Sequence, residues 1–323
     1  MTHQARYTEA GTTAGTRQPV RGGWYATTGT RRPVRASRYM APGAATGTVA
    51  SMSDGDARAL EPSGDQPSPA DAFARWAASE PVPLDRAALA IAAHCRADQV
   101  DEAAALAELD RLANAVREPT PTAVVELLFN AEGFGPNRGR FADPANSYLD
   151  LVVSRRMGIP ITLAVVTIEV ARRASLDLHG VGMPGHFLVG TPDPDTFIDA
   201  FGGRIIDRAG AAAIFARFES RQAFDDAFLQ PTPSEAILLR MLNNLRTLHL
   251  RQPDAPSLVA VLELLTRLPG CPIDEFMRLG QALATLGRPD KGAQVLESAA
   301  DQFGGSDAEH LNQAATRLWA QLN

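Results

Sequence analysis

The spacing of apolar residues predicts a chain that is largely helical at both ends. In the first ordered stretch, apolar positions recur every three or four residues, which is typical of amphipathic helices. Prolines separate these stretches and mark their ends. The pattern predicts helices over 71–79, over a segment with the apolar stripe Leu84, Ala88 and Ile91, and over 98–117 and 122–131.

The pattern changes near residue 146. A helix capped by Asn146 or Ser147 is expected to end at the Arg155-Arg156 pair, whose charges suit the negative end of a helix dipole. Pro160 then fits the first turn of a new helix. That helix, residues 160–174, is apolar nearly all round, and a helix without a polar face is buried.

A strand over 178–183 and a β-hairpin are predicted to follow. The hairpin turn is the segment Thr191-Pro-Asp-Pro-Asp195, which separates two apolar runs. A turn centred near Pro192 and Asp193 places His186 almost directly opposite Asp199. A buried helix followed by antiparallel strands predicts an α+β core. Residues 204–230 are predicted to return to helix.

After Pro233 the chain is predicted to be wholly helical and weakly repetitive. Helices are expected over 234–248, 257–268, 273–286, 290–303 and 307–322. The segment Leu250-Arg-Gln-Pro-Asp254 recurs as Leu286-Gly-Arg-Pro-Asp290, and a helix-turn-helix unit of ~34 residues is the tetratricopeptide period. The last helix would cap the stack.

Charge and composition restrict the class of protein. The first 50 residues hold seven arginines and one acidic residue, whereas the whole chain carries a net charge of −6, so residues 51–323 carry −12. An acidic body argues against nucleic-acid binding as the main function. The basic head lacks apolar periodicity, so residues 1–66 are predicted to be disordered. An upstream extension of the reading frame, with translation starting at Met40 or Met52, is favoured over a nucleic-acid-binding tail. With no apolar run long enough for a membrane span and no signal peptide, a cytoplasmic location and reduced thiols at Cys95 and Cys271 are expected.

The candidate chemistry centres on His186 and Asp199. A carboxylate opposite a histidine fixes the ring tautomer and leaves the other nitrogen free, as in a catalytic dyad. The alternative is a core histidine satisfied by its aspartate, although the surrounding glycines favour a cleft. A nucleophile is missing: Thr162 is the one hydroxyl in the first turn of the 160–174 helix, and a back-bonding structural role suits it better.

No cofactor is expected, because the chain has neither a glycine-rich phosphate loop nor a dinucleotide fingerprint. Three metal ligands could be assembled from His179, His186, Asp199 and Asp143, but their spacing matches no metal-site pattern, so no metal is expected. Arg155-Arg156 could clamp a phosphate or carboxylate, with the helix-end charge pair as the default interpretation.

Four ordered motifs resemble the SirB-type transglutaminase-like proteins, which join a transglutaminase-like domain to C-terminal tetratricopeptide repeats. The motifs are Asp143–Leu149, Arg155–Leu163, Gly180–Val189 and Asp199–Gly203. The resemblance covers roughly residues 70–310. It implies a papain-like core with a helical N-terminal piece over 67–230, and helical repeats over 231–323. As a separate domain, the repeats are expected to be removable without unfolding the core.

The wider superfamily uses a Cys-His-Asp triad, with the cysteine in a Gly-x-Cys-x-x-x-Ala pattern. Laid on this chain, the pattern runs from Gly158 to Ala164 and puts Pro160 at the cysteine position, while His186 and Asp199 match the other two members. The resemblance leaves the activity undefined. With a proline at the cysteine position, the leading hypothesis is a non-catalytic protein that binds a peptide or protein partner through its groove and repeats, in a regulatory role. The alternatives are a hydrolase or acyl transferase that uses the dyad with Thr162 or an activated water, and a scaffold whose core is only structural.

Overall fold

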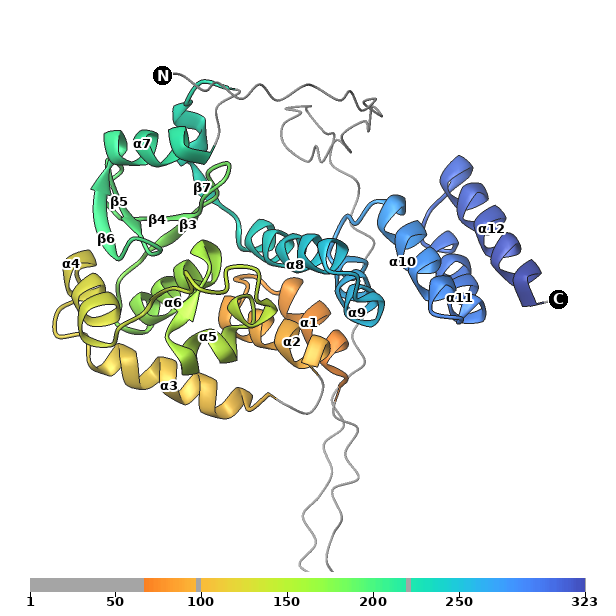
Figure 1. The fold of residues 1–323 in the computed structure, drawn as a ribbon, viewed down its shortest axis with the longest axis horizontal. Helices are drawn as coiled ribbons and strands as arrows, with labels where there is room; N and C mark the ends of the chain where they lie inside the picture. Colours follow the sequence, from red (N-terminus) through yellow and green to blue (C-terminus); the bar gives the residue numbers. More distant parts are fainter. Residues whose placement is uncertain (1–66, 97–99, 219–221, 323) are drawn as a thin grey trace, which may run out of the picture. The chain divides into compact units, whose positions relative to one another are not determined.

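The structure is a computed structural model that describes residues 67–96, 100–218 and 222–322 (Figure 1). All of them belong to one compact unit, residues 63–323. The expectation of a disordered head over residues 1–66 lies outside the described residues. In these residues no helix is long and apolar enough to cross a membrane.

Short helices form the N-terminal part, as the apolar spacing predicts. Side-chain oxygens cap three of them: Ser68, Asp101 and Thr120 each accept a hydrogen bond from the amide three residues later. The bounds are α1 Pro69–Ala77, α2 Leu84–Arg96, α3 Glu102–Asn114 and α4 Pro121–Val125, which continues into the π-helical turn η2 Glu126–Ala131.

Two helices of the middle section cross the core. They are α5 Leu149–Arg155 and α6 Pro160–Arg173, preceded by the 3-10 turn η3 Pro144–Asn146. Helix α6 is buried at every position from Ile161 to Ala171, which confirms the prediction of a central buried helix. Two short parallel strands, β1 Gly135–Pro136 and β2 Met157–Gly158, pair beside its start.

A five-stranded antiparallel sheet lies between α6 and α7 (Figure 1), in the order β6-β5-β4-β3-β7. Alternate residues of its strands face opposite sides: Val189 and Ile198 pack into the core that contains α6, whereas Leu188 and Phe197 pack against α7. The bounds are β3 His179–Val181, β4 Leu188–Gly190, β5 Thr196–Asp199, β6 Arg204–Asp207, β7 Pro231–Thr232 and α7 Arg208–Phe218.

The prediction that residues 204–230 return directly to helix is wrong at its start. Residues 204–207 form the edge strand β6, which pairs with β5 across the turn at Gly202 and Gly203. Three of the four β6 residues are exposed, so the strand lacks the apolar alternation that would have marked it. Helix α7 and the 3-10 turn η4 Asp226–Leu229 follow it.

The hairpin register also differs from the prediction by two residues. Val189 pairs with Ile198. If the same register is extended by one residue, Leu188 lies opposite Asp199, where the sequence predicted His186. The turn is centred later than expected because the carboxylate of Asp193 accepts hydrogen bonds from the amide of Asp195 and the hydroxyl of Thr196. A slip of two residues keeps every side chain on its own face, so His186 and Asp199 still share one.

The C-terminal region is helical throughout, and successive helices pack on one another. Its bounds are α8 Ser234–Arg251, α9 Ala255–Leu265, α10 Ile273–Thr285, α11 Pro289–Ala300 and α12 Gly305–Trp319, with the 3-10 turn η5 Ala320–Leu322 at its end. Helices α10 and α11 approach closely at Gly292, where a Cβ atom would lie 2.5 Å from the carbonyl oxygen of Gly280.

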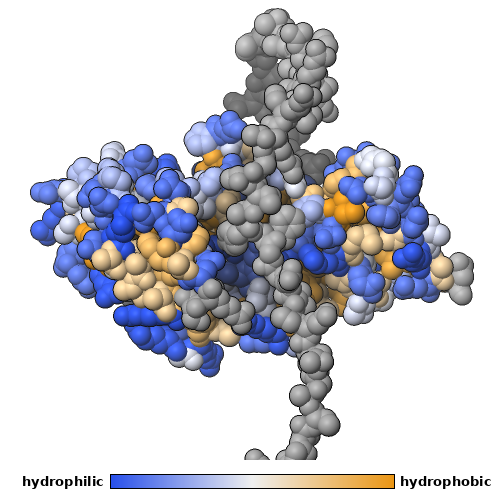
Figure 2. Space-filling model, turned by 90° about the horizontal axis from the view of Figure 1, so that it is seen from above, coloured by the Kyte–Doolittle hydropathy of each residue, from blue (hydrophilic) through white to orange (hydrophobic). Residues whose placement is uncertain are grey.

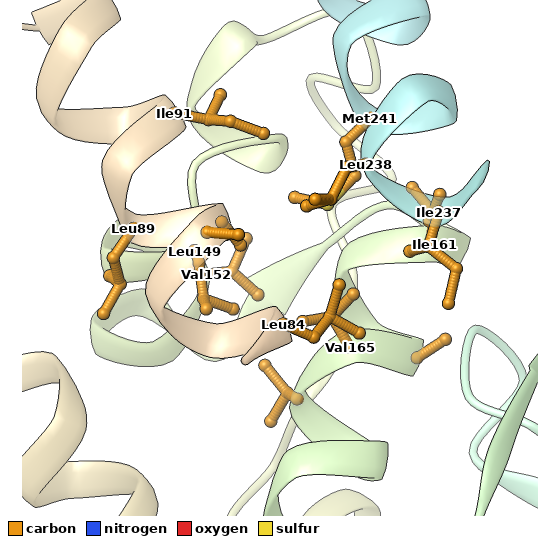
Figure 3. Packing of buried hydrophobic residues seen from close by; sticks show 14 of the residues in the cluster. Leu84, Leu89, Ile91, Leu149, Val152, Ile161, Val165, Ile237, Leu238 and Met241 are labelled. Carbon is orange, nitrogen blue, oxygen red and sulfur yellow. The ribbon is translucent and has the colours of Figure 1, made fainter. Parts of the chain in front are cut away.

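Helix α8 belongs to the same hydrophobic core as the N-terminal helices (Figure 3). Its residues Ile237, Leu238 and Met241 point into a cluster with side chains from α2, α5 and α6. On the face seen in Figure 2, apolar areas lie among hydrophilic residues. The division at residue 231 therefore runs through a continuous apolar core.

Candidate binding cleft

His186 and Asp199 form a buried pair beside the sheet. His186 lies two residues before β4 and Asp199 ends β5, and Nε2 of the ring is 2.9 Å from Oδ1 of the carboxylate. The residues are only 3% and 4% exposed. The sequence therefore predicted the contact correctly although the register differs.

The charge state of Asp199 determines which nitrogen of His186 carries the proton. Burial acts most strongly on the pKa of this carboxyl and would raise it. The hydrogen bond from His186, the positive charge that this ring carries when protonated, and the amide of Gly202 together outweigh burial and lower the pKa. Asp199 is thus a carboxylate, which accepts only. Nε2 of His186 must then donate, and in the neutral ring Nδ1 is left as an acceptor.

Nδ1 of His186 is buried and has no hydrogen-bond partner among the described residues. The ring is held by aromatic contacts instead: Phe218 stacks on it with centroids 5.5 Å apart, and Phe201 meets it edge-on at 5.9 Å. A buried polar atom without a partner costs stability. Such an atom at a cleft is typical of a site that receives a ligand or water.

His186 lines a cleft with a volume of about 370 Å³. One wall is the start of α6, at Ile159, Pro160 and Ile161, and another is the polar face of α8. Asp143 and Ser147, from the segment around η3, also line the cleft. The cleft is therefore built from the loop before β4, the start of the buried helix and the first helix of the C-terminal region.

Thr162 lies behind this lining and is fully buried. Its hydroxyl donates to the carbonyl of Asn146 at 2.7 Å and accepts from the amide of Ile159 at 3.1 Å. Asn146 in turn accepts from the side chain of Asn137 and donates to the carbonyl of Arg140. Both functions of the hydroxyl are thus engaged in fixing the 137–147 segment to α6, which agrees with the structural alternative weighed from the sequence.

Neither cysteine lines the cleft. Cys95 lies in α2 against Tyr148, and burial raises the pKa of its thiol to about 12. Cys271 precedes α10, and burial likewise raises its pKa to about 12. Because the thiolate is the nucleophilic form, both thiols are unreactive at neutral pH.

The other candidates from the sequence lie in different surroundings. His179, on β3, packs against Gly190 and lines a separate surface pocket with Asp193. In the described part of the chain, no three His, Cys, Asp or Glu side chains are arranged to hold a metal ion. The Arg155-Arg156 pair is used in ion pairs: Arg155 with Asp143, and Arg156 with Glu108 and Glu132.

The contribution of α8 to the cleft was not predicted. Arg240, Asn244, Thr247 and Arg251 line it from one side of the helix. Their spacing of four, three and four residues marks a polar helix face, and that signal is visible in the sequence. What the spacing could not show is that this face meets His186 across a cleft.

Comparison with known proteins identifies relatives of the chain. The family model described as transglutaminase-like superfamily matches residues 98–243. A UPF0162 protein of Pseudomonas aeruginosa is 33% identical over 181 residues, which cover 53% of this chain and 67% of the relative. A UPF0162 protein of Xylella fastidiosa strain Temecula1 is 42% identical over 134 residues, covering 39% of this chain and 48% of the relative.

A more distant similarity involves a eukaryotic protein. F-box only protein 21 of Mus musculus is 34% identical over 67 residues, which cover 21% of this chain and 11% of that protein. The chain spans about half the length of the Xylella relatives that it matches. No solved structure matches the chain.

Proposed function

This chain belongs to the UPF0162 family of transglutaminase-like proteins, and we propose that it is a non-catalytic member that binds a peptide or protein partner through the cleft at His186. A regulatory role is part of the proposal. The observation that carries it is a cleft lined by both His186 and Pro160, with the proline at the position that matches the cysteine of the superfamily. A proline ring has no group that can form a covalent intermediate.

The walls of the cleft suit ligand binding. Its volume lies within the range of ligand pockets, about 300–1,000 Å³. Arg240 of α8 donates hydrogen bonds to the carbonyls of Met183 and His186, at 3.0 and 2.8 Å, and its guanidinium lies over the ring of Phe187. These contacts hold the histidine loop in one place, and a preorganised wall lowers the entropic cost of binding.

We further propose that helices α8 to α12 are tetratricopeptide-like repeats, as in the SirB-type proteins. The recurring segment at 250–254 and 286–290 falls in both cases at a junction between two helices, α8 with α9 and α10 with α11. Stacked helix pairs present a surface that suits a partner protein. A cytoplasmic location remains a prediction from the sequence.

One observation favours a second function, a hydrolase that activates water. With Nε2 bound to Asp199, Nδ1 of the neutral His186 ring would be a lone-pair acceptor, and it has no partner in the described residues. A histidine oriented in this way can remove a proton from water. Thr162 is less suited to the nucleophile role, because its hydroxyl is buried and bonded to backbone on both sides.

Two measurements on the full chain test the proposal. Random hexapeptide libraries are panned against the wild-type protein and against His186→Gln, with His310→Gln on the exposed surface of α12 as the matched control. We expect wild type and control to enrich a common peptide motif and His186→Gln to lose it while its melting temperature stays within a few degrees. Failure of the wild type to enrich any motif would contradict the binding function.

Turnover is measured in parallel with fluorogenic amide and ester probes. We expect the wild type to hydrolyse them no faster than His186→Gln. Turnover that is lost in His186→Gln and kept in Thr162→Val, which lacks the hydroxyl, would instead establish the hydrolase with an activated water.

A further inference from the structure

We propose that the ligand of the cleft is acidic, with a carboxylate that pairs with Arg251 of α8 and a hydrogen-bond donor that faces Nδ1 of His186. The inference rests on the proposed binding function and names the chemical class of its ligand. It follows from the charges along the cleft and from Nδ1 of His186, a buried polar atom that has no partner among the described residues.

Cationic side chains come from one wall. Arg240 and Arg251 both line the cleft from α8. Arg240 donates hydrogen bonds to the carbonyls of Met183 and His186, which fix its guanidinium in the wall of the cleft. Its positive charge therefore stays at the cleft. Arg251 is exposed at the end of the helix, and no described residue forms an ion pair with it. It is therefore the guanidinium available to a ligand.

The acidic side chain in the lining is already neutralised. Asp143 lies 3.4 Å from the guanidinium of Arg155 and also accepts a hydrogen bond from the amide of Ala145. The cleft is thus positive, although residues 51–323 carry a net charge of −12. A local reversal of sign within a hollow concentrates ligands of the opposite charge and speeds their association.

The second requirement comes from His186. His186 lines the cleft, and its buried Nδ1 can accept a hydrogen bond when the ring is neutral. A carboxylate alone cannot donate to it, whereas the N–H of a peptide unit can. A peptide bearing an acidic group meets both requirements. That group is either an Asp or Glu side chain or a free C-terminal carboxylate.

The experiment pans two random hexapeptide libraries against the full chain, one with amidated and one with free C-termini. We expect the wild type to enrich Asp and Glu in the amidated library if the recognised group is a side chain. Enrichment confined to the free library would identify the terminal carboxylate. Raising the salt concentration should weaken binding of the enriched peptide in either case.

Variants of Arg251 test its role. Arg251→Gln should lower the affinity for the enriched peptide about fivefold, which corresponds to the loss of one exposed ion pair. Arg251→Glu should shift the enriched residues from Asp and Glu to Lys and Arg. Arg117→Gln, which removes an exposed arginine outside the cleft lining, should have no effect.

The possible failures are distinguishable. A motif that depends on His186 but contains no acidic group, or whose affinity is unchanged in Arg251→Gln, would overturn this inference and leave the binding function standing. If the wild type enriches nothing, both are overturned.

Discussion

The guanidinium of Arg240 donates a hydrogen bond to the main-chain carbonyl of His186 at 2.8 Å, across 54 residues of sequence. A second bond from the same guanidinium reaches the carbonyl of Met183. Helix α8 thereby holds the loop that presents the histidine. The cleft is consequently formed by the histidine loop, the start of α6 and helix α8, and the match to the transglutaminase-like family model ends within α8.

Removing the Arg240 side chain should loosen this loop. Because two carbonyls lose a charged donor, we expect Arg240→Ala to lower the free energy of unfolding by about 2–4 kcal/mol. Hydrogen exchange should also become faster at the amides of His186 and Phe187. Arg251→Ala, on the same helix but exposed, is the control. Equal exchange rates in the two variants would show that Arg240 does not position the loop.

Thr162 is predicted to be structural. In Thr162→Val the hydroxyl is lost at nearly constant volume, so the carbonyl of Asn146 and the amide of Ile159 lose their buried partner. We expect a loss of about 1–3 kcal/mol by chemical denaturation. Thr162→Ser keeps the hydroxyl and should therefore retain most of the stability that Thr162→Val loses. A Val variant as stable as the wild type would argue against this role.

The Asp199 carboxylate should stabilise the protein above acidic pH. Its pKa is lowered in the folded state, so its contribution is fully present above its unfolded pKa of about 3.9 and is lost as the pH falls through the folded value. Asp199→Asn should therefore be less stable than the wild type at neutral pH, and the difference should shrink below about pH 4. Urea unfolding of both proteins at a series of pH values measures the difference in the free energy of unfolding. A difference that stays constant with pH would contradict the assignment.

Truncation should show that α8 is part of the core. Deleting residues 231–323 removes, from α8 alone, five apolar side chains that are at most 2% exposed: Ile237, Leu238, Met241, Leu242 and Leu245. At about 1.5–3 kcal/mol each, their loss is comparable to the whole stability of a domain. From this packing we predict an unfolded core after the deletion, which is the opposite of the outcome expected from the sequence.

The matched truncation ends at residue 269 and keeps α8 and α9. We expect it to give a cooperative thermal transition by circular dichroism, while the shorter chain ending at residue 230 is unfolded or insoluble. A folded, protease-resistant chain ending at residue 230 would show that α8 is dispensable.

Local patterns in the sequence were sufficient for most elements. The buried helix α6 was predicted because Pro160 marks its start and apolar residues occupy nearly every later position. The pairing of His186 with Asp199 was predicted because a hairpin has only two faces, so even a register error of two residues leaves both side chains on the same one. Strand β6 was missed because its exposed edge carries no apolar alternation.

The sequence by itself determined the helical periodicity, the position of Pro160 and the face shared by His186 and Asp199, because each depends on neighbours a few residues away or on a single hairpin. Only the tertiary structure decided that α8 enters the core and places Arg240 and Arg251 at the cleft. The physical reason is that the apolar stripe of α8 indicates only that this face of the helix is buried. Which elements it packs against depends on how its side chains fit those of α2, α5 and α6. The spacing of residues within α8 does not contain that information.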